Sequence, residues 1–185
     1  MRIIAGEFKS RKLNFPKTPL TRPMTDKARE TLFNIIGDFA DGKRVLDLYS
    51  GSGSVGCEAI SRGALDVTFV DQADWATKVI RQNLKSLNIE QKADILQSEV
   101  LRAIKKLDKN GSRFSLVFVD PPYNQGLVKK TLILLDQSAI VAPFAQVCVG
   151  HSKQEQLPET LEFLKLARTK QIGQSYLSFY FRLES

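Results

Sequence analysis

Apolar residues follow two different spacings along most of the chain. Short continuous apolar runs, typical of buried parallel strands, cover residues 44–49, 67–70, 93–96, 114–119 and 145–149. Between them, apolar residues recur at intervals of three and four, which predicts helices that begin near residue 25, after the turn at 50–53, at residue 74, after residue 98 and near residue 127. Strands that alternate with helices in this way predict β-α-β units, and therefore a parallel sheet covered by helices on both faces.

The two ends of the chain depart from this alternation. Three prolines exclude a continuous helix from residues 1–24, where we predict a short β-hairpin around Gly6. Near the other end, the pattern predicts a short helix at 158–164 and two strands, at 166–171 and 176–183. Because no crossover helix separates these two strands, we expect them to form a hairpin at one edge of the sheet.

These elements together predict an α/β protein with a Rossmann-like fold. We expect a mostly parallel, seven-stranded sheet with an antiparallel edge strand and helices on both faces. The sequence has no internal repeat, no low-complexity segment and no interior linker, so we expect one domain over residues 1–185. Residues 1–40 would form an N-terminal extension of hairpin and helix, and residues 41–185 the core.

The composition is that of a folded domain that needs no covalent or metal crosslinks. The 185 residues are 43% hydrophobic, which is enough for a substantial core. Cys57 and Cys148 form neither a CxxC pair nor a zinc-ligand spacing, and we predict no metal site. No stretch reaches 18 apolar residues and the N-terminus lacks a signal-peptide core, so we expect no membrane contact and a cytoplasmic location.

Positive charge is concentrated near the N-terminus. The net charge is +7, and residues 1–30 hold eight basic and three acidic side chains, which leaves the other 155 residues nearly neutral. A basic segment on a neutral body predicts contact with a polyanion such as nucleic acid. The alternative is an ordinary solvated surface.

A glycine-rich turn, Asp-Leu-Tyr-Ser-Gly-Ser-Gly-Ser-Val-Gly at 47–56, lies between the first predicted strand and its helix. Glycines there allow a ligand to approach the backbone, and the helix N-terminus offers free N–H groups. Asp71 ends the second strand, 20 residues after Gly51, where a carboxylate can accept hydrogen bonds from ribose hydroxyl groups. The pattern predicts a nucleotide-type ligand rather than a purely structural turn.

The charge of Asp47 indicates which nucleotide fits. A carboxylate at the end of the first strand would repel a pyrophosphate, and no Lys or Arg lies between Asp47 and Ser61 to neutralise it. A ligand with an adenine, a ribose and a cationic end, such as S-adenosylmethionine, suits the site better. Glu99, after the third strand, either accepts a hydrogen bond from the adenine amino group or is simply an acid in the first turn of a helix.

An Asp-Pro-Pro-Tyr motif at 120–123 ends the most hydrophobic strand, where open α/β sheets bind substrates. The prolines stiffen the turn and leave carbonyl groups without local N–H partners. Together with the Asp120 carboxylate, these carbonyls can accept both hydrogens of an exocyclic base amine and concentrate its lone pair. Tyr123 offers a face on which a flipped base can stack. The alternative is a structural proline turn.

The motifs at 47–56, 71 and 120–123 resemble those of class I S-adenosylmethionine-dependent methyltransferases that modify amino nitrogens. Residues 2–13 (RIIAGEFKSRKL), 22–34 (RPMTDKARETLFN) and 58–64 (EAISRGA) are similar to segments of the RsmD family, almost from end to end. That family methylates the N2 amine of one guanine in bacterial 16S rRNA. The resemblance implies a class I methyltransferase fold, S-adenosyl-L-methionine as cofactor, and 16S rRNA as partner, within the small subunit or a late assembly intermediate. We expect a monomer.

The resemblance also assigns roles to individual residues, with Asp47 at the methionine end of the cofactor and Asp71 at its ribose. The predicted cofactor-binding residues are Thr25, Asp47, Gly51, Gly53, Gly56, Asp71 and Glu99. The predicted catalytic residues are Asp120, Pro121, Pro122 and Tyr123. The predicted RNA-binding residues are Arg2, Lys9, Arg11, Lys12, Arg22 and Arg29.

Other functions stay open from the sequence alone. The same motif serves enzymes that methylate adenine N6 in DNA or RNA, the glycine spacing also permits an NAD-dependent dehydrogenase, and a basic arm would suit a non-catalytic RNA-binding factor. The chain also departs from the RsmD pattern at two positions. Gly150 stands where the family commonly has an acid, and Glu99 where it often has a neutral residue or Asp.

Overall fold

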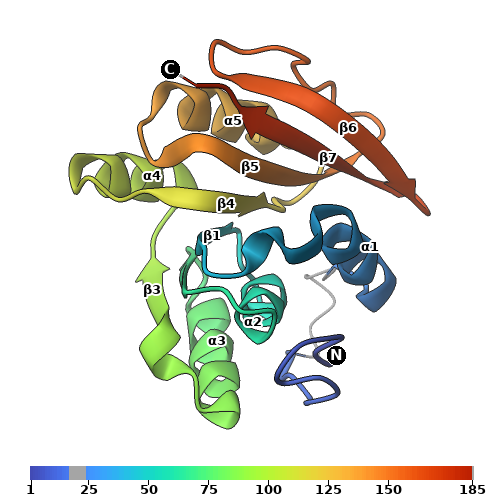
Figure 1. The fold of residues 1–185 in the computed structure, drawn as a ribbon, viewed down its shortest axis with the longest axis vertical. Coiled ribbons are helices and arrows are strands. Elements are labelled where there is room, and N and C mark those ends of the chain that lie inside the picture. Colours follow the sequence, from blue (N-terminus) through green and yellow to red (C-terminus); the bar gives the residue numbers. More distant parts are fainter. Residues whose placement is uncertain (17–23, 185) are drawn as a thin grey trace.

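The computed structural model describes residues 1–16 and 24–184, and in this part of the chain seven strands form one twisted sheet (Figure 1). Their order across the sheet is β3-β2-β1-β4-β5-β7-β6. The strands are β1 (Arg44–Leu48), β2 (Asp66–Asp71), β3 (Ala93–Gln97), β4 (Phe114–Val119), β5 (Val141–Ser152), β6 (Leu164–Ile172) and β7 (Ser175–Arg182). β1 to β5 pair in parallel, and β7 pairs antiparallel with both β5 and β6.

Helices cover both faces of the sheet and form two hydrophobic cores. α1 (Asp26–Ile36), α2 (Ser54–Ser61) and α3 (Asp74–Leu87) pack on one face, around Phe69 and Phe118. α4 (Val100–Lys109) and α5 (Leu127–Gln137) pack on the other, around Val117 and Val147. Two short 3-10 helices, Gly37–Ala40 and Glu90–Lys92, lead into β1 and β3. Within the described ranges, every helix is too short or too polar to span a bilayer.

The predicted fold class is confirmed, with one refinement and one error. The final two strands form the predicted hairpin, but the antiparallel strand, β7, lies one place in from the edge, between β5 and β6. The predicted helix at 158–164 is wrong. The buried Asp136 carboxylate instead accepts hydrogen bonds from the backbone N–H groups of Glu162, Phe163 and Leu164, and these bonds hold the segment as an irregular loop.

The N-terminal hairpin forms as predicted. Ile3 N donates to Arg11 O at 2.9 Å, Ser10 N donates to Ile3 O at 2.9 Å, and Arg2 pairs with Lys12. This hairpin, which we call the N-terminal arm (residues 1–16), lies beside α2 and buries Ile3 and Leu13 (Figure 1). The arm is therefore part of the folded body.

Candidate functional site

A pocket of about 810 Å³ opens at the carboxyl ends of β1, β2 and β4, where open α/β sheets bind their ligands. Three groups of residues predicted from the sequence meet there: the glycine turn, the second-strand acid and the Asp-Pro-Pro-Tyr motif. The predicted residues that line it are Thr25, Asp47, Gly51, Asp71, Glu99, Asp120, Pro121, Pro122 and Tyr123. Gly53 and Gly56 do not line the pocket. Both lie against the Phe69 side chain.

The glycine turn brings the start of α2 against the end of β1. Gly51 and Gly53 have φ values of 54° and 73°, a conformation that favours glycine. A Cβ on Gly56 would lie 2.2 Å from the Phe69 ring, so glycine is required there for α2 to pack on β2. At this separation, Gly56 N donates to Asp47 Oδ2 at 3.0 Å. The first turn of α2 therefore fixes the Asp47 carboxyl group through this backbone hydrogen bond.

Asp71 is fixed by backbone groups on both of its oxygens. Its Oδ2 accepts from Gly51 N and its Oδ1 from Ala73 N, both at 2.9 Å. Each oxygen keeps a lone pair that can accept a further hydrogen bond. This arrangement suits a carboxylate that binds vicinal hydroxyl groups.

Burial raises the pKa of two carboxyl groups in the pocket. The pKa of Asp47 is raised to about 8, chiefly by burial and further by the charges of Asp120 and Asp71, although the Gly56 hydrogen bond opposes the shift. Burial also raises the pKa of Asp120 to about 6, against a hydrogen bond with the Tyr123 side chain. Among residues 1–16 and 24–184, no lysine or arginine forms an ion pair with either group. A bound cation would therefore stabilise both carboxylates.

The Asp-Pro-Pro-Tyr motif turns away from the sheet directly after β4. Asp120 N lies 3.5 Å from Leu48 O, which keeps the acid beside the end of β1. Pro121 is buried, Pro122 is exposed, and Tyr123 is half-buried with its side chain hydrogen-bonded to Asp120. The motif thus presents a carboxylate and an aromatic ring to the same pocket.

Thr25 and Glu99 both cap helices at the pocket. Thr25 Oγ1 accepts from Ala28 N at 3.1 Å and starts α1. Glu99 accepts from Leu101 N at 3.0 Å and from Arg102 N at 2.9 Å, and starts α4. The two interpretations of Glu99 are therefore compatible, because a capping carboxylate still has lone pairs for a ligand.

The predicted RNA-binding residues do not all lie on the surface. Arg2, Lys9, Arg11 and Lys12 are exposed on the N-terminal arm, where Arg11 Nη2 donates to Ser86 O at 2.6 Å. Arg22 lies outside the described residues. The prediction for Arg29 is wrong as a surface contact, because its side chain is fully buried.

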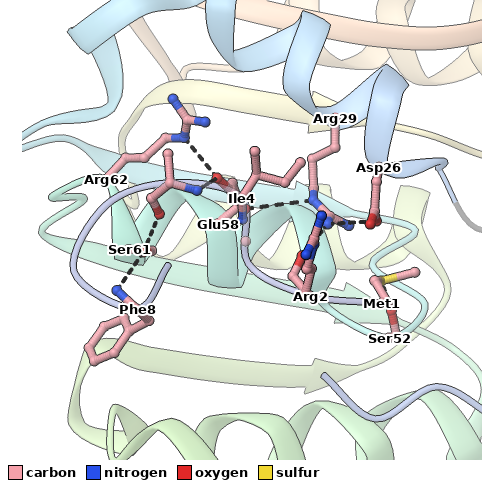
Figure 2. A network of polar contacts seen from close by, with 12 residues as sticks. Met1, Arg2, Ile4, Phe8, Asp26, Arg29, Ser52, Glu58, Ser61 and Arg62 are labelled. Carbon is pink, nitrogen blue, oxygen red and sulfur yellow. Dashed lines mark hydrogen bonds and ion pairs between the residues drawn. The ribbon is translucent and has the colours of Figure 1, made fainter. Parts of the chain in front are cut away.

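Arg29 is instead part of a polar network beneath the arm (Figure 2). Its Nη2 donates to Arg2 O and pairs with Asp26 Oδ1 at 3.0 Å, and its Nε lies 3.7 Å from Glu58 Oε2. The sequence did contain a signal for this burial. Arg29 precedes Leu32, Phe33 and Ile36 at helical spacing, which places it on the apolar face of α1.

Sequence reasoning missed several residues that line the pocket. These are chiefly Phe15 and Met24 near the N-terminus, Trp75 at the start of α3, and residues 172–177 around the turn between β6 and β7. Trp75 could have been found from the sequence, because it lies four residues after Asp71, in the first turn of the helix that follows this predicted cofactor-binding acid. The β6–β7 turn could not, because its position depends on the pairing of β7 with β5.

The two cysteines are free, buried and unsuited to nucleophilic chemistry. Burial raises the pKa of Cys57 to about 12 and also raises the pKa of Cys148. Both thiols therefore stay protonated near neutral pH.

Comparisons with known proteins agree with this geometry. The family described as "Conserved hypothetical protein 95" matches residues 1–181. Ribosomal RNA small subunit methyltransferase D of Escherichia coli (strain K12) is 34% identical over 182 residues, which cover 98% of this chain and 90% of that protein. The structure of yhhF from Escherichia coli, a candidate methyltransferase by name, is 31% identical with a TM-score of 0.89 and covers 100% of this chain and 99% of its own.

A more distant structure shares the fold alone. The RNA methyltransferase from Salinibacter ruber, in complex with S-adenosyl-L-homocysteine, has a TM-score of 0.68 at 14% identity, over 89% of this chain and 95% of its own. The strand order, the glycine turn and the acid-bearing pocket define a class I methyltransferase. Within that class, the chain belongs to the Conserved hypothetical protein 95 family, which is the RsmD family that the sequence motifs predict.

Proposed function

We propose that this protein transfers a methyl group from S-adenosylmethionine to the exocyclic N2 amine of a guanine in 16S rRNA. The observation that carries the proposal is the meeting of Asp47, Asp71 and the Asp-Pro-Pro-Tyr motif in one pocket. The relative named as a small-subunit ribosomal RNA methyltransferase supports the substrate class. The choice of guanine N2 rests on the RsmD motifs.

The residues of the pocket fit S-adenosylmethionine. The buried Asp47 carboxyl group would bind the cationic methionine end, and Asp71 would accept from the ribose hydroxyl groups. When bound, S-adenosylmethionine supplies a methyl group activated by its sulfonium charge. Thr25, Trp75 and Glu99 line the same pocket and would surround the rest of the molecule.

The same contacts disfavour a dinucleotide such as NAD. A pyrophosphate needs free N–H groups at the first helix N-terminus, but here Gly56 N already donates to Asp47. The carboxyl group also occupies the position where a negative charge would have to bind. The geometry therefore favours methyl transfer over the dehydrogenase alternative.

Asp120 and its neighbours would activate the base amine. The amine's lone pair is delocalised into the ring, so the nitrogen is a poor nucleophile until its hydrogens are held. The Asp120 carboxylate and the Pro121 carbonyl would accept these two hydrogens and stabilise the positive charge that develops on nitrogen. Asp120 can then accept the proton that the methylated nitrogen releases, because burial raises its pKa to about 6.

The N-terminal arm would bind RNA phosphates beside the pocket. Its exposed basic residues are Arg2, Lys9, Arg11 and Lys12, while Phe15 at its end lines the pocket itself. The arm has no element that reads base edges, so it would recognise folded RNA through shape and charge. A chain of 185 residues covers little RNA by itself, and we propose that a monomer acts in the cytoplasm on the small subunit or a late assembly intermediate.

Labelled S-adenosylmethionine, supplied to small subunits that lack the modification, to naked 16S rRNA and to duplex DNA, tests this function. Mapping the labelled nucleotide identifies the base and the atom. We expect label at guanine N2 in small-subunit RNA, and incorporation only into DNA or at adenine N6 would overturn the substrate assignment.

The Asp120→Ala variant tests the chemistry in the same assay. We expect turnover to fall by about 10³-fold, because the charge-stabilising acceptor is removed, while affinity for S-adenosylhomocysteine stays within a few-fold. Asp94→Ala, which removes an exposed carboxylate on β3, is the matched control and should retain full turnover. Near-normal methylation by Asp120→Ala would contradict the mechanism.

A further inference from the structure

The carboxyl end of β5 lies against the Asp-Pro-Pro-Tyr motif at two points. β4 and β5 run in parallel with Val119 opposite Val149. Asp120, the first residue after β4, therefore lies beside Gly150, which is still paired with Leu177 within the sheet. Neither the proposed reaction nor the predicted site residues assign a role to the end of β5.

The first contact is between Gly150 and the carboxyl group of Asp120. A Cβ on Gly150 would lie 2.3 Å from Asp120 Oδ1 and 3.1 Å from its Cγ, well inside van der Waals contact. The φ of Gly150 is not positive, so its backbone is one that any residue adopts. Space, and not conformation, is therefore what requires glycine here.

The volume left free by Gly150 is small and faces both acids. A void of about 10 Å³ is lined by Asp47, Asp120, Cys148 and Gly150, among others. It holds at most one water molecule. The Asp120 carboxyl group thus fills the space that a side chain at position 150 would occupy. Asp47 lines the same void.

The second contact is between Ser152 and Asn124, the residue that follows Tyr123. Ser152 Oγ donates to Asn124 Oδ1 at 2.6 Å, and Asn124 has a φ of 61°, in the left-handed region. Ser152 is buried, and its own N–H donates to Glu155 Oε2 at 3.1 Å. A fixed hydroxyl group therefore holds the far end of the motif.

We infer that Gly150 and Ser152 are positioning residues for the transfer reaction: Gly150 admits the Asp120 carboxylate to its place, and Ser152 anchors the loop that carries Tyr123. The inference rests on the proposed amino-methyl transfer. Such reactions require the nucleophile in line with the methyl group, and a displacement of about 1 Å costs about 10²-fold in rate.

Gly150→Ala is the direct test, with kcat and KM measured separately on small subunits. We expect kcat to fall by about 10²-fold, and KM for S-adenosylmethionine to stay within about twofold, because the three atoms nearest to the added methyl group all belong to Asp120. Ser152→Ala should lower kcat by about tenfold, with KM for the cofactor again unchanged.

Val149→Ala is the matched control, since this buried neighbour packs in the core on the opposite face of the sheet. It should lower Tm but leave kcat within about twofold. Equal reductions of kcat in Val149→Ala and Gly150→Ala, or normal kcat in both Gly150→Ala and Ser152→Ala, would overturn the inference. Should Gly150→Ala not fold, Ser152→Ala and Val149→Ala still decide it.

A measurement without substrate separates this inference from the proposed function. The titration of Asp120 can be followed by ¹³C NMR; its titratable neighbours are Asp47 on β1, Tyr123 in its own loop and Cys148 on β5. Displacement toward solvent should bring its pKa from about 6 toward the ordinary value of an aspartate in Gly150→Ala. An unchanged Asp120 pKa in Gly150→Ala would overturn the inference even if the wild-type enzyme is active. If the Asp120 pKa shifts in the variant but the wild-type protein methylates no RNA, the result would count only against the proposed function.

Discussion

The side-chain amide of Asn83 pairs with both backbone polar groups of Asn14. Asn83 Oδ1 accepts from Asn14 N at 2.7 Å, and Asn83 Nδ2 donates to Asn14 O at 3.1 Å. The same Nδ2 also donates to Ser52 O at 2.9 Å. One buried amide therefore joins the N-terminal arm, α3 and the glycine turn.

Asn83→Ala should weaken both the fold and the cofactor site. The substitution leaves three backbone groups without their partner, so we expect the free energy of unfolding to fall by about 3 kcal/mol. Because the Ser52 carbonyl is released, affinity for S-adenosylhomocysteine should fall several-fold. Urea unfolding and calorimetric titration measure the two effects. The control, Gln91→Ala on the surface after α3, should change neither, and a variant that loses stability with unchanged affinity would show that the turn does not depend on Asn83.

Glu58 holds the other end of the arm (Figure 2). Its Oε2 accepts from Ile4 N at 2.8 Å, and its Oε1 accepts from Ala5 N at 3.0 Å and from Arg62 Nε at 2.9 Å. The buried Arg29 guanidinium lies beside it, with Nε and Nη1 lacking a hydrogen-bond partner in the described structure. The negative charge of Glu58, which is fully buried, and that of Asp26 therefore together compensate the buried charge of Arg29.

Glu58→Gln should destabilise the protein strongly despite its similar shape. Breaking this buried ion pair leaves the Arg29 charge with only the half-exposed Asp26 carboxylate to compensate it, and we expect the free energy of unfolding to fall by about 3 kcal/mol. Hydrogen exchange should accelerate at the amides of Ile4 and Ala5, which would show that the arm has loosened. Asp66→Asn is the control, because it breaks the exposed pair with Arg44 and should cost less than about 1 kcal/mol. Similar destabilisation in the two variants would mean that the buried network is not the anchor.

Parallel-strand periodicity is enough to predict where the acids of the site meet. Asp47, Asp71 and Asp120 each lie at the end of a short apolar strand, and parallel strands bring their carboxyl ends to one edge. The surroundings of the acids require tertiary structure. The clearance between Gly150 and Asp120 depends on the register of β4 with β5, which no local pattern encodes.

Long-range polar contacts also account for the two wrong predictions. The charge of Arg29 predicts a surface position, but Glu58, 29 residues further along, allows the side chain to be buried. The local composition predicts a helix at 158–164, but Asp136 on α5 binds the N–H groups of residues in this segment. In both places a buried carboxylate far away in the sequence overrides the local preference.

The stability of the ligand-free protein should depend on pH chiefly through Asp47, with a smaller contribution from Asp120, whose pKa is raised to about 6. The folded protein keeps the Asp47 proton up to about pH 8, because burial raises the pKa of this group from its ordinary value of 3.8. The folded state therefore binds more protons between these values, and its stability falls as pH rises through this range. Thermal unfolding at about pH 5 and about pH 8 should show this decline in the wild-type protein.

Asp47→Asn should flatten that decline and raise Tm near pH 8 by about 5 °C, since the neutral amide carries no desolvated charge. The amide oxygen can still accept from Gly56 N, so the turn keeps its shape. Affinity for S-adenosylhomocysteine should fall by about tenfold or more, because the carboxylate no longer meets the ligand's ammonium group. A variant with the wild-type pH dependence would show that another group is responsible.

The charge of the N-terminal arm should affect RNA binding without affecting the cofactor. Lys9 and Lys12 are exposed on the arm, and changing both to Gln removes two positive charges while Arg11 keeps its bond to Ser86. We expect weaker binding to small subunits at low salt, and a slope of log affinity against log salt reduced by about 1 for each phosphate that the arm no longer neutralises. Lys105→Gln with Lys109→Gln on α4 removes the same charge from a different part of the surface and is the control. If both double variants weaken binding equally, the arm contributes only to overall charge; if only the arm variant does so, with S-adenosylhomocysteine affinity unchanged, the arm binds the RNA.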